Sequence, residues 1–119
     1  MSVHVAVDIG ASSGRVIVAE YEDNHFEVSE VHRFKNGFGH VDGHDRWNID
    51  DLFDNILKGL AKVKERGIAE CTLGIDTWAV DYVLVKDGEK LGHPIAYRDS
   101  RTQKGVENVF AKISKEDLY

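Results

Sequence analysis

The octet Asp8 to Arg15 (DIGASSGR) gathers the residue types best suited to chemistry in this 119-residue chain. Its two glycines let the backbone approach a ligand closely and take positive φ angles, and successive N–H groups of such a turn can surround an anion. Ser12 and Ser13 add hydroxyl donors, and Arg15 adds a planar cation that suits phosphate oxygens. Asp8 is a candidate ligand for hydrated Mg²⁺, which prefers one or two carboxylates together with nucleotide phosphates. The octet therefore predicts a phosphate-binding loop beside a metal-binding carboxylate.

An ordinary hairpin turn is the alternative interpretation, because Ser12 and Ser13 can equally satisfy backbone groups of their own turn. The octet differs from the GxxxxGK[ST] phosphate loop, since it lacks the lysine and leads into a strand rather than a helix. A helix N-terminus is therefore not expected to hold the phosphate. Spacing alone leaves both interpretations open.

Strand-like segments flank the octet and must position it. Val3–Ile9 and Arg15–Tyr21 are rich in β-branched residues, and the turn Gly10–Gly14 joins them into a hairpin. Phe26–Phe34 alternates apolar and polar residues with a register break near Glu30, which predicts a third antiparallel strand. The buried candidates of this third strand are Phe26, Val28 and Val31.

The segment Lys35–Arg46 has little periodicity and is predicted to be a loop of about a dozen residues, a length that is uncommon unless the loop is functional. Three interpretations are open for its polar side chains: a metal cluster, a part in shaping a ligand site, or a solvated loop. The metal interpretation is disfavoured, because the spacing matches no closed zinc pattern and no cysteine lies nearby. The side chains concerned are His40, Asp42, His44 and Asp45.

An amphipathic helix is predicted from Ile49 onward, because apolar residues recur there three and four positions apart. Asn48 can cap its start, Asp50 and Asp51 suit its positive end, and Gly67 can end it in the left-handed conformation. Its apolar face is expected to comprise Ile49, Leu52, Phe53, Ile56, Leu57, Leu60 and Ala61.

Shorter elements follow this helix. Thr72–Ile75 predicts a short buried strand, Val80–Val85 another, and the Asp-Gly pair at 87–88 a hairpin turn. A second amphipathic stretch comes next, and Ser114 with Asp117 has capping-box spacing, so another helix is expected to begin there. The apolar face of that second stretch is Val106, Val109, Phe110 and Ile113. Together these elements predict an α/β fold with a mixed sheet, an N-terminal antiparallel three-strand meander and flanking helices.

Composition narrows the class of partner. The formal net charge is −6, which argues against nucleic acid, because that ligand is bound by clustered Lys and Arg. No apolar run approaches the roughly 18 residues of a membrane span, and no signal-peptide pattern opens the chain, so no membrane partner and a cytoplasmic location are predicted. The single cysteine, Cys71, is expected to be a small buried side chain.

Three ordered motifs, DIGASSGR at 8–15, GIDTWAVDY at 74–82 and YRDSRT at 97–102, resemble rhamnulokinases within the FGGY family of carbohydrate kinases. The resemblance extends from Val5 to Tyr119. It implies the ribonuclease H-like (actin-like ATPase) fold, with residues 1–119 forming the N-terminal part of the first of two kinase domains that close over ATP and sugar. The general-base Asp is then expected beyond this segment, so no catalytic residue is predicted within it and the isolated segment is expected to be inactive.

The resemblance also implies individual binding roles. ATP phosphates are expected at Ala11, Ser12, Ser13, Gly14 and Arg15, and Mg²⁺ at Asp8. Sugar contacts are expected at Trp78, Ala79, Val80 and Asp81. Trp78 also fits a core position, and Asp81, like Asp99, also fits a turn or ion-pair carboxylate.

The reaction implied by the resemblance is ATP-dependent phosphorylation of L-rhamnulose to L-rhamnulose 1-phosphate. Two alternatives stay open. One is a kinase of the same family for another ketose or polyol, such as fuculose or xylulose. The other is a non-catalytic actin-like protein that binds sugar or ATP as a regulator. No oligomeric state is predicted.

Overall fold

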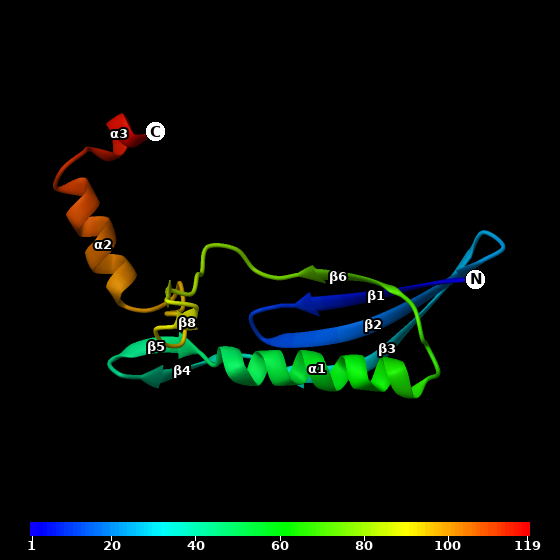
Figure 1. Cartoon of the computed structure of the whole chain (residues 1–119). Coiled ribbons are helices and arrows are strands. Elements are labelled where there is room, and N and C mark those ends of the chain that lie inside the picture. The colour runs from blue at the N-terminus through cyan, green and yellow to red at the C-terminus, as the bar shows by residue number, and fades with distance from the viewer. The chain divides into compact units, whose positions relative to one another are not determined.

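The computed structural model describes all 119 residues, and they divide into two compact units. Unit 1 comprises Met1–Gly37 and Asn48–Ala79, and unit 2 comprises Phe38–Trp47 and Val80–Tyr119. In chain order (Figure 1) the elements are β1 (Ser2–Ile9), β2 (Ser13–Glu22), β3 (His25–Lys35), β4 (Phe38–Val41), β5 (His44–Trp47), α1 (Ile49–Glu65), β6 (Thr72–Asp76), β7 (Val85–Lys86), β8 (Glu89–Lys90), α2 (Arg101–Phe110) and α3 (Lys115–Leu118).

A four-stranded mixed sheet in the order β3-β2-β1-β6 forms unit 1. The first three strands are an antiparallel meander, and β6 pairs in parallel with β1. Helix α1 lies along this sheet (Figure 1). It belongs to the connection from β3 to β6, which also includes β4 and β5 of unit 2. The predicted mixed sheet with an N-terminal meander is confirmed.

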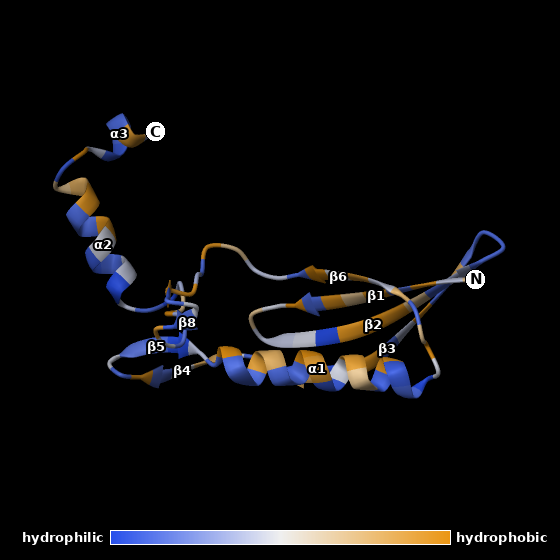
Figure 2. Ribbon diagram, in the orientation of Figure 1, coloured by the Kyte–Doolittle hydropathy of each residue, from blue (hydrophilic) through white to orange (hydrophobic).

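The core of unit 1 lies between the sheet and one face of α1. Its buried residues are Val5, Val7, Ile9, Val16, Val18 and Val63. They alternate along β1 and β2, as expected when one face of a sheet is covered. Figure 2 shows the apolar residues of α1 interrupted by polar ones along its length. Leu52, Ile56 and Leu60 pack on this core, whereas Phe53 and Leu57 of the predicted face are exposed.

Both ends of α1 follow their predicted signals. The Asn48 side chain accepts a hydrogen bond from the Asp51 N–H at 3.1 Å, and Gly67 has a φ of +83°. In the middle of the helix, Gly59 allows a close approach to the sheet. A Cβ added there would lie 2.3 Å from Cγ2 of Val16, so no larger residue fits without displacement.

A β-bulge in β3 confirms the predicted register break near Glu30, because the pairing steps from Val16–His32 to Ile17–Glu30 and leaves Val31 between them. The bulge inverts the alternation of the strand. Phe26 and Val28 pair with the residues of β2 that face away from α1, and they are exposed. Predicting burial for Phe26 and Val28 was therefore wrong, and Phe34, beyond the bulge, is the buried aromatic residue of β3.

Strand β6 occupies the edge of the sheet and is exposed along its length, which corrects the prediction of a buried strand. Helix α1 packs on β2 and β3, so Leu73 and Ile75 at this edge are 49% and 59% exposed. Cys71, immediately before β6, is exposed as well, and the prediction that it is buried was wrong.

Unit 2 contains two short hairpins, β4–β5 and β7–β8. The first lies where a long loop was predicted. Its turn at Asp42 and Gly43 has φ angles of +52° and +78°, the pattern that an Asp-Gly pair favours in a two-residue hairpin. The second hairpin confirms the turn at 87–88, but residues 80–84 form no strand, so the strand predicted over 80–85 begins only at Val85.

Few side chains of unit 2 are buried, chiefly Trp47, Ala96 and Asp99. The segment 94–96 is held to β5 by two backbone hydrogen bonds, from the Trp47 N–H to the Pro94 carbonyl and from the Ala96 N–H to the Asp45 carbonyl. Helix α2 follows, with its predicted apolar residues exposed, and α3 begins at the predicted cap, where Ser114 accepts from the Asp117 N–H. None of the three helices is both long and apolar enough to cross a membrane.

Candidate functional site

The phosphate-loop octet forms the tip of the β1–β2 hairpin. The two strands pair as far as Ile9 and Gly14, and within the tip the Gly10 N–H donates to the Ser13 carbonyl at 2.9 Å. Asn36, just after β3, holds the same tip twice: its N–H donates to the Ser12 carbonyl and its Nδ2 to the Gly10 carbonyl, each at 2.9 Å. Three carbonyl oxygens of the tip are thus occupied within unit 1.

Four hydrogen-bond donors of the tip have no such partners. The backbone N–H groups of Ala11 and Ser12 donate to no group of the chain, and neither do the hydroxyls of Ser12 and Ser13. Ser12 is exposed and Ala11 and Ser13 are half-buried. Because three carbonyls of the tip are engaged and these four donors are open, the tip offers positive dipole ends to a ligand, which is the polarity that an anion requires.

The glycines of the octet act differently from the prediction. Neither Gly10 nor Gly14 has a positive φ, so left-handed backbone is not their function here. Gly14 lies inside β2, and a Cβ there would lie 2.1 Å from the Phe34 ring. Glycine is required at 14 because the aromatic ring of β3 packs directly over its backbone.

Asp8 and Arg15 face one another across the paired strands. They are register partners, and Arg15 Nη2 donates to Asp8 Oδ2 in an ion pair whose side chains are 44% and 39% exposed for Asp8 and Arg15. Their neighbours Val7, Ile9 and Val16 point into the core, so this pair lies on the face of the sheet away from α1. The predicted metal ligand and the predicted phosphate cation therefore neutralise each other.

A second carboxylate that the sequence analysis missed stands beside this pair. Asp76 of β6 is the register partner of Asp8 in the parallel β1–β6 pairing, so both carboxylates lie on the same face at the carboxyl ends of neighbouring strands. Its signal was present in the motif GIDTW, where an acidic residue ends a short strand as Asp8 does in VAVDI.

The predicted sugar-binding residues divide between the two units. In unit 1, Trp78 is half-buried and packs against the core, the alternative kept open for it, and Ala79 is exposed. In unit 2, Val80 is 73% exposed with a φ of +73°, a strained conformation for a β-branched residue. Asp81 accepts a hydrogen bond from Trp47 Nε1 at 2.6 Å, which fixes the segment after Val80 to β5.

Asp99 is the most enclosed polar group of unit 2, at 3% exposure. It accepts hydrogen bonds from the Asp45 N–H at 2.7 Å, His44 Nδ1 at 2.9 Å and the Arg101 N–H at 3.3 Å. The pKa of Asp99 is lowered to about 2, chiefly by the hydrogen bond from the Asp45 N–H and next by the hydrogen bond from His44. These bonds join β5 to the start of α2, so the structure gives Asp99 a supporting role.

The polar side chains of the β4–β5 hairpin do not gather into a metal site. His40 Nδ1 lies 3.1 Å from Asp45 Oδ1, and His44 bonds to Asp99 instead. No group of three His, Cys, Asp or Glu side chains in the chain is arranged to hold a metal ion. Asp42 belongs to the hairpin turn.

Comparison with known sequences places the chain alongside one kind of enzyme. It is 58% identical over its whole length to a rhamnulokinase from Ligilactobacillus salivarius, 52% to one from Lactiplantibacillus plantarum, and 48% over 98% of its length to one from Bacillus subtilis. The chain spans about a quarter of the length of these relatives: 25%, 25% and 24%. No family model matches it. The resemblance predicted from the three motifs is confirmed.

Solved structures support the predicted fold. A gluconate kinase from Lactobacillus acidophilus aligns with 92% of the chain at a TM-score of 0.68 and 14% identity, over 22% of its own length. A ligand-bound xylulose kinase from the same organism aligns with 93% at a TM-score of 0.68 and 14% identity, over 23% of its length. The ribonuclease H-like (actin-like ATPase) fold of sugar kinases is thereby confirmed for this chain.

Proposed function

From its similarity to the first quarter of rhamnulokinases, we propose that this chain is the phosphate-binding part of a kinase that transfers the γ-phosphoryl group of ATP to a ketose, L-rhamnulose in the first instance. The product is L-rhamnulose 1-phosphate. In this proposal residues 1–119 are the N-terminal part of the first kinase domain. A cytoplasmic location, where ATP is available, stays a prediction.

The observation that carries the proposal is the polarity of the hairpin tip. Asn36 and the Gly10–Ser13 bond engage three carbonyls of the tip, while the N–H groups of Ala11 and Ser12 and two serine hydroxyls are left open. These donors suit the oxygens of a nucleotide triphosphate, and they are fixed before the ligand arrives. Pre-organised donors stabilise charge on a transferring phosphoryl group without reorganisation at the moment of reaction.

Arg15 and Asp8 complete the site by exchanging partners. On ATP binding, the Arg15 guanidinium turns from the Asp8 carboxylate to a phosphate oxygen, where it acts as a fixed cation. Asp8, with Asp76 on the neighbouring strand, would then hold a hydrated Mg²⁺ ion. The metal ion would supply positive charge that offsets the charge of the phosphates.

The sugar is assigned to Trp78, Ala79, Val80 and Asp81 in this proposal. Strained backbone such as that of Val80 clusters at ligand clamps, which supports a contact to substrate by its main chain. Ala79 offers only backbone and a methyl group. No residue of the chain is assigned the role of general base, so we expect the 119-residue chain to bind nucleotide without phosphorylating sugar.

A chimaera tests the proposal. Residues 1–119 replace the corresponding first quarter of the Ligilactobacillus salivarius relative, and ADP release is followed with L-rhamnulose, L-fuculose, D-xylulose and glycerol. The expected result is turnover with L-rhamnulose as the preferred substrate. Preference for another ketose would favour a different FGGY kinase, and ATP binding without turnover on any sugar would favour a regulator.

The loop is tested in the same chimaera with Arg15→Gln. We expect KM for ATP to rise by about tenfold, the size expected when one charge-assisted contact to phosphate is lost. Arg33→Gln is the matched control, because Arg33 pairs with Arg15 in register on β3 but bonds to Glu30. Equal KM values for the two variants would exclude Arg15 from the phosphate site.

A further inference from the structure

A cavity in unit 2 is lined by none of the residues assigned to ATP or sugar, although Tyr82 in its wall directly follows Asp81. Its volume is about 210 Å³, which is below the roughly 300–1,000 Å³ of sites for drug-sized ligands and suits a small metabolite. Two arginines, Arg46 and Arg101, line it together with Tyr82 and His93, and none of its lining residues is acidic. For a chain with a net charge of −6, this is a local concentration of positive charge.

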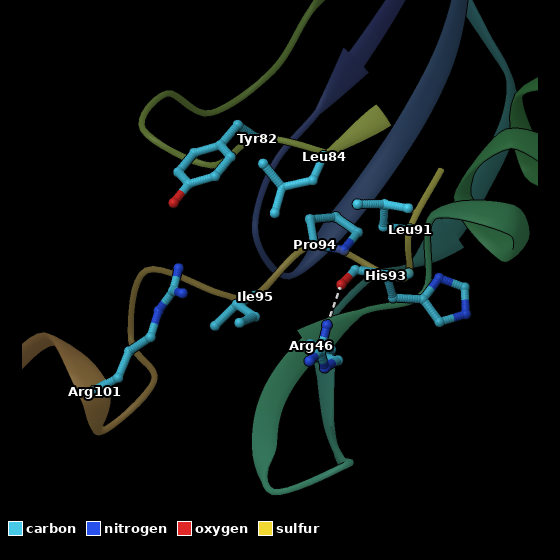
Figure 3. A pocket seen from close by; sticks show the side chains of 9 residues that line it. Arg46, Tyr82, Leu84, Leu91, His93, Pro94, Ile95 and Arg101 are labelled. Carbon is cyan, nitrogen blue, oxygen red and sulfur yellow. Dashed lines mark hydrogen bonds between the residues drawn. The ribbon is translucent and has the colours of Figure 1, made fainter. Parts of the chain in front are cut away.

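The two arginines differ in what they already bind. Arg46 Nη1 donates to the His93 carbonyl at 2.7 Å and its Nε to the Val41 carbonyl at 3.3 Å, so this guanidinium is fixed in place by the chain (Figure 3). The Arg101 guanidinium has no partner in the chain. Tyr82, whose hydroxyl also has none, extends toward Arg101 in Figure 3. The cavity thus offers a planar cation and a hydroxyl that are both available to a ligand.

The remaining wall of the cavity is apolar. Leu84, Leu91 and Ile95 line it, and Figure 3 shows their side chains on the side where Pro94 lies, with Arg101 reaching in from the start of α2. Such a surface gains nothing from a bare inorganic anion, but it favours one that carries a carbon skeleton. Charge on one side and apolar contact on the other suit the phosphate monoester of a small organic alcohol, whose carbon skeleton can lie against the leucines.

We propose that this cavity binds a small phosphate monoester, with its dianion held by Arg101 and Tyr82 beside the fixed charge of Arg46. Its residues all belong to unit 2 and differ from those of the hairpin tip, which belongs to unit 1. Arginine suits this role, since its fork of N–H donors matches phosphate oxygens in pairs. The proposal does not depend on the kinase activity.

The experiment follows amide resonances of the ¹⁵N-labelled 119-residue chain during titration with glycerol 3-phosphate, L-rhamnulose 1-phosphate, inorganic phosphate and neutral L-rhamnulose. Expected shifts centre on residues 82–95 and Arg101, with a phosphate monoester binding more tightly than inorganic phosphate and neutral sugar binding weakest. Tighter binding of the ketose phosphate than of glycerol 3-phosphate would identify the reaction product as the ligand. The reverse order would identify another metabolite, and either order supports the site.

Arg101→Gln is the variant of choice, because this guanidinium supports no part of the fold. We expect it to weaken monoester binding by about tenfold, the size expected for a lost charge-assisted contact. Arg98→Gln removes the same charge three positions away, where the guanidinium lies 5.5 Å from the centre of the Tyr97 ring and outside the cavity, and binding should change by less than about twofold.

Three results would overturn the proposal. One is a set of shifts confined to the hairpin tip at 10–15, which would show that the monoester binds only at the predicted ATP site. Another is equal loss of affinity in Arg101→Gln and Arg98→Gln, which would reduce the effect to general charge. The third is neutral L-rhamnulose binding as tightly as the monoesters, which would make this a hydroxyl site.

Discussion

The two units of this chain are stabilised in different ways. Unit 1 buries a continuous group of valines and Ile9 between a four-stranded sheet and α1. Unit 2 has two short hairpins and an amphipathic helix that buries no residue, and its enclosed centre includes a carboxylate, Asp99, with three donors around it. Apolar packing therefore dominates the first unit and hydrogen bonding the second.

Amphipathic sequence does not by itself decide burial, and the two main helices show why. Helices α1 and α2 both carry apolar residues three and four positions apart, but α1 has a sheet face to cover. Val109 and Phe110 of α2 are 45% and 41% exposed, whereas Val63 of α1 is 3% exposed. Hydrophobic stabilisation follows area removed from water, so equal patterns should give unequal energies.

The largest expected difference comes from one substitution made in each unit. Val16→Ala removes two methyl groups from a fully buried position, and we expect the free energy of unfolding to fall by about 2–3 kcal/mol. Val109→Ala removes the same groups from an exposed helix position and should change it by about 0.5 kcal/mol or less. Urea unfolding followed by circular dichroism measures both, and similar losses would contradict the contrast between the units.

A glycine in each helix gives a smaller and opposite pair of effects. Ala is favoured over Gly within a helix by about 1 kcal/mol. Gly105→Ala in α2 meets no atom within 4 Å and should gain that stability. Gly59→Ala places its Cβ 2.3 Å from Val16 Cγ2, so we expect a net loss of about 1–2 kcal/mol despite the better propensity.

Thermal melting of the two glycine variants gives the measurement, with Gly67→Ala as a reference for backbone strain, because Gly67 has a φ of +83° and no neighbour within 4 Å. If Gly59→Ala were stabilising, the packing of α1 on β2 would be looser than the structure shows. The two units would then no longer differ in how tightly their helices are packed.

Sequence patterns predicted the elements whose signals are local. The β1–β2 hairpin, the bulge in β3 and α1 with its Asn48 cap all depend on neighbouring residues. The β4–β5 hairpin could have been predicted too, since Asp42-Gly43 carries the same turn signal as Asp87-Gly88. The prediction of a loop there was wrong because it did not take account of this Asp-Gly turn signal, which is present in the sequence.

Features that depend on distant pairing were out of reach. The position of Phe34 over Gly14 and the two bonds from Asn36 to the hairpin tip require the register of β2 against β3. The place of Asp76 beside Asp8 requires the parallel pairing of β6 with β1. The sequence pattern identifies the residues of the octet. Only the strand topology shows that four donors of the tip have no partner and that Arg15 and Asp8 form an ion pair.

Low pH should destabilise unit 2 more than unit 1, and this is the smallest and most local of the expected effects. The pKa of Asp99 is lowered to about 2 in the fold from an ordinary value of 3.8. A lowered pKa contributes stability that is fully present above the ordinary value and is lost as pH falls toward the folded one. Between pH 4 and pH 2 unit 2 should therefore weaken progressively. In unit 1 the pKa of Glu30 is also lowered, by its bond to Arg33, but that exposed surface pair should contribute little.

Amide spectra recorded from pH 6 to pH 2 test this directly. The Asp45 and Arg101 resonances, whose N–H groups donate to Asp99, should lose their native positions over that interval, while Val7 and Val18 in the apolar core keep theirs. Asp99→Asn removes the Asp99 carboxyl and should reduce the pH dependence at the Arg101 amide while lowering the stability of unit 2 at neutral pH. Simultaneous loss at all four positions would mean that the two units unfold as one, and their separate modes of stabilisation would then have no thermodynamic consequence.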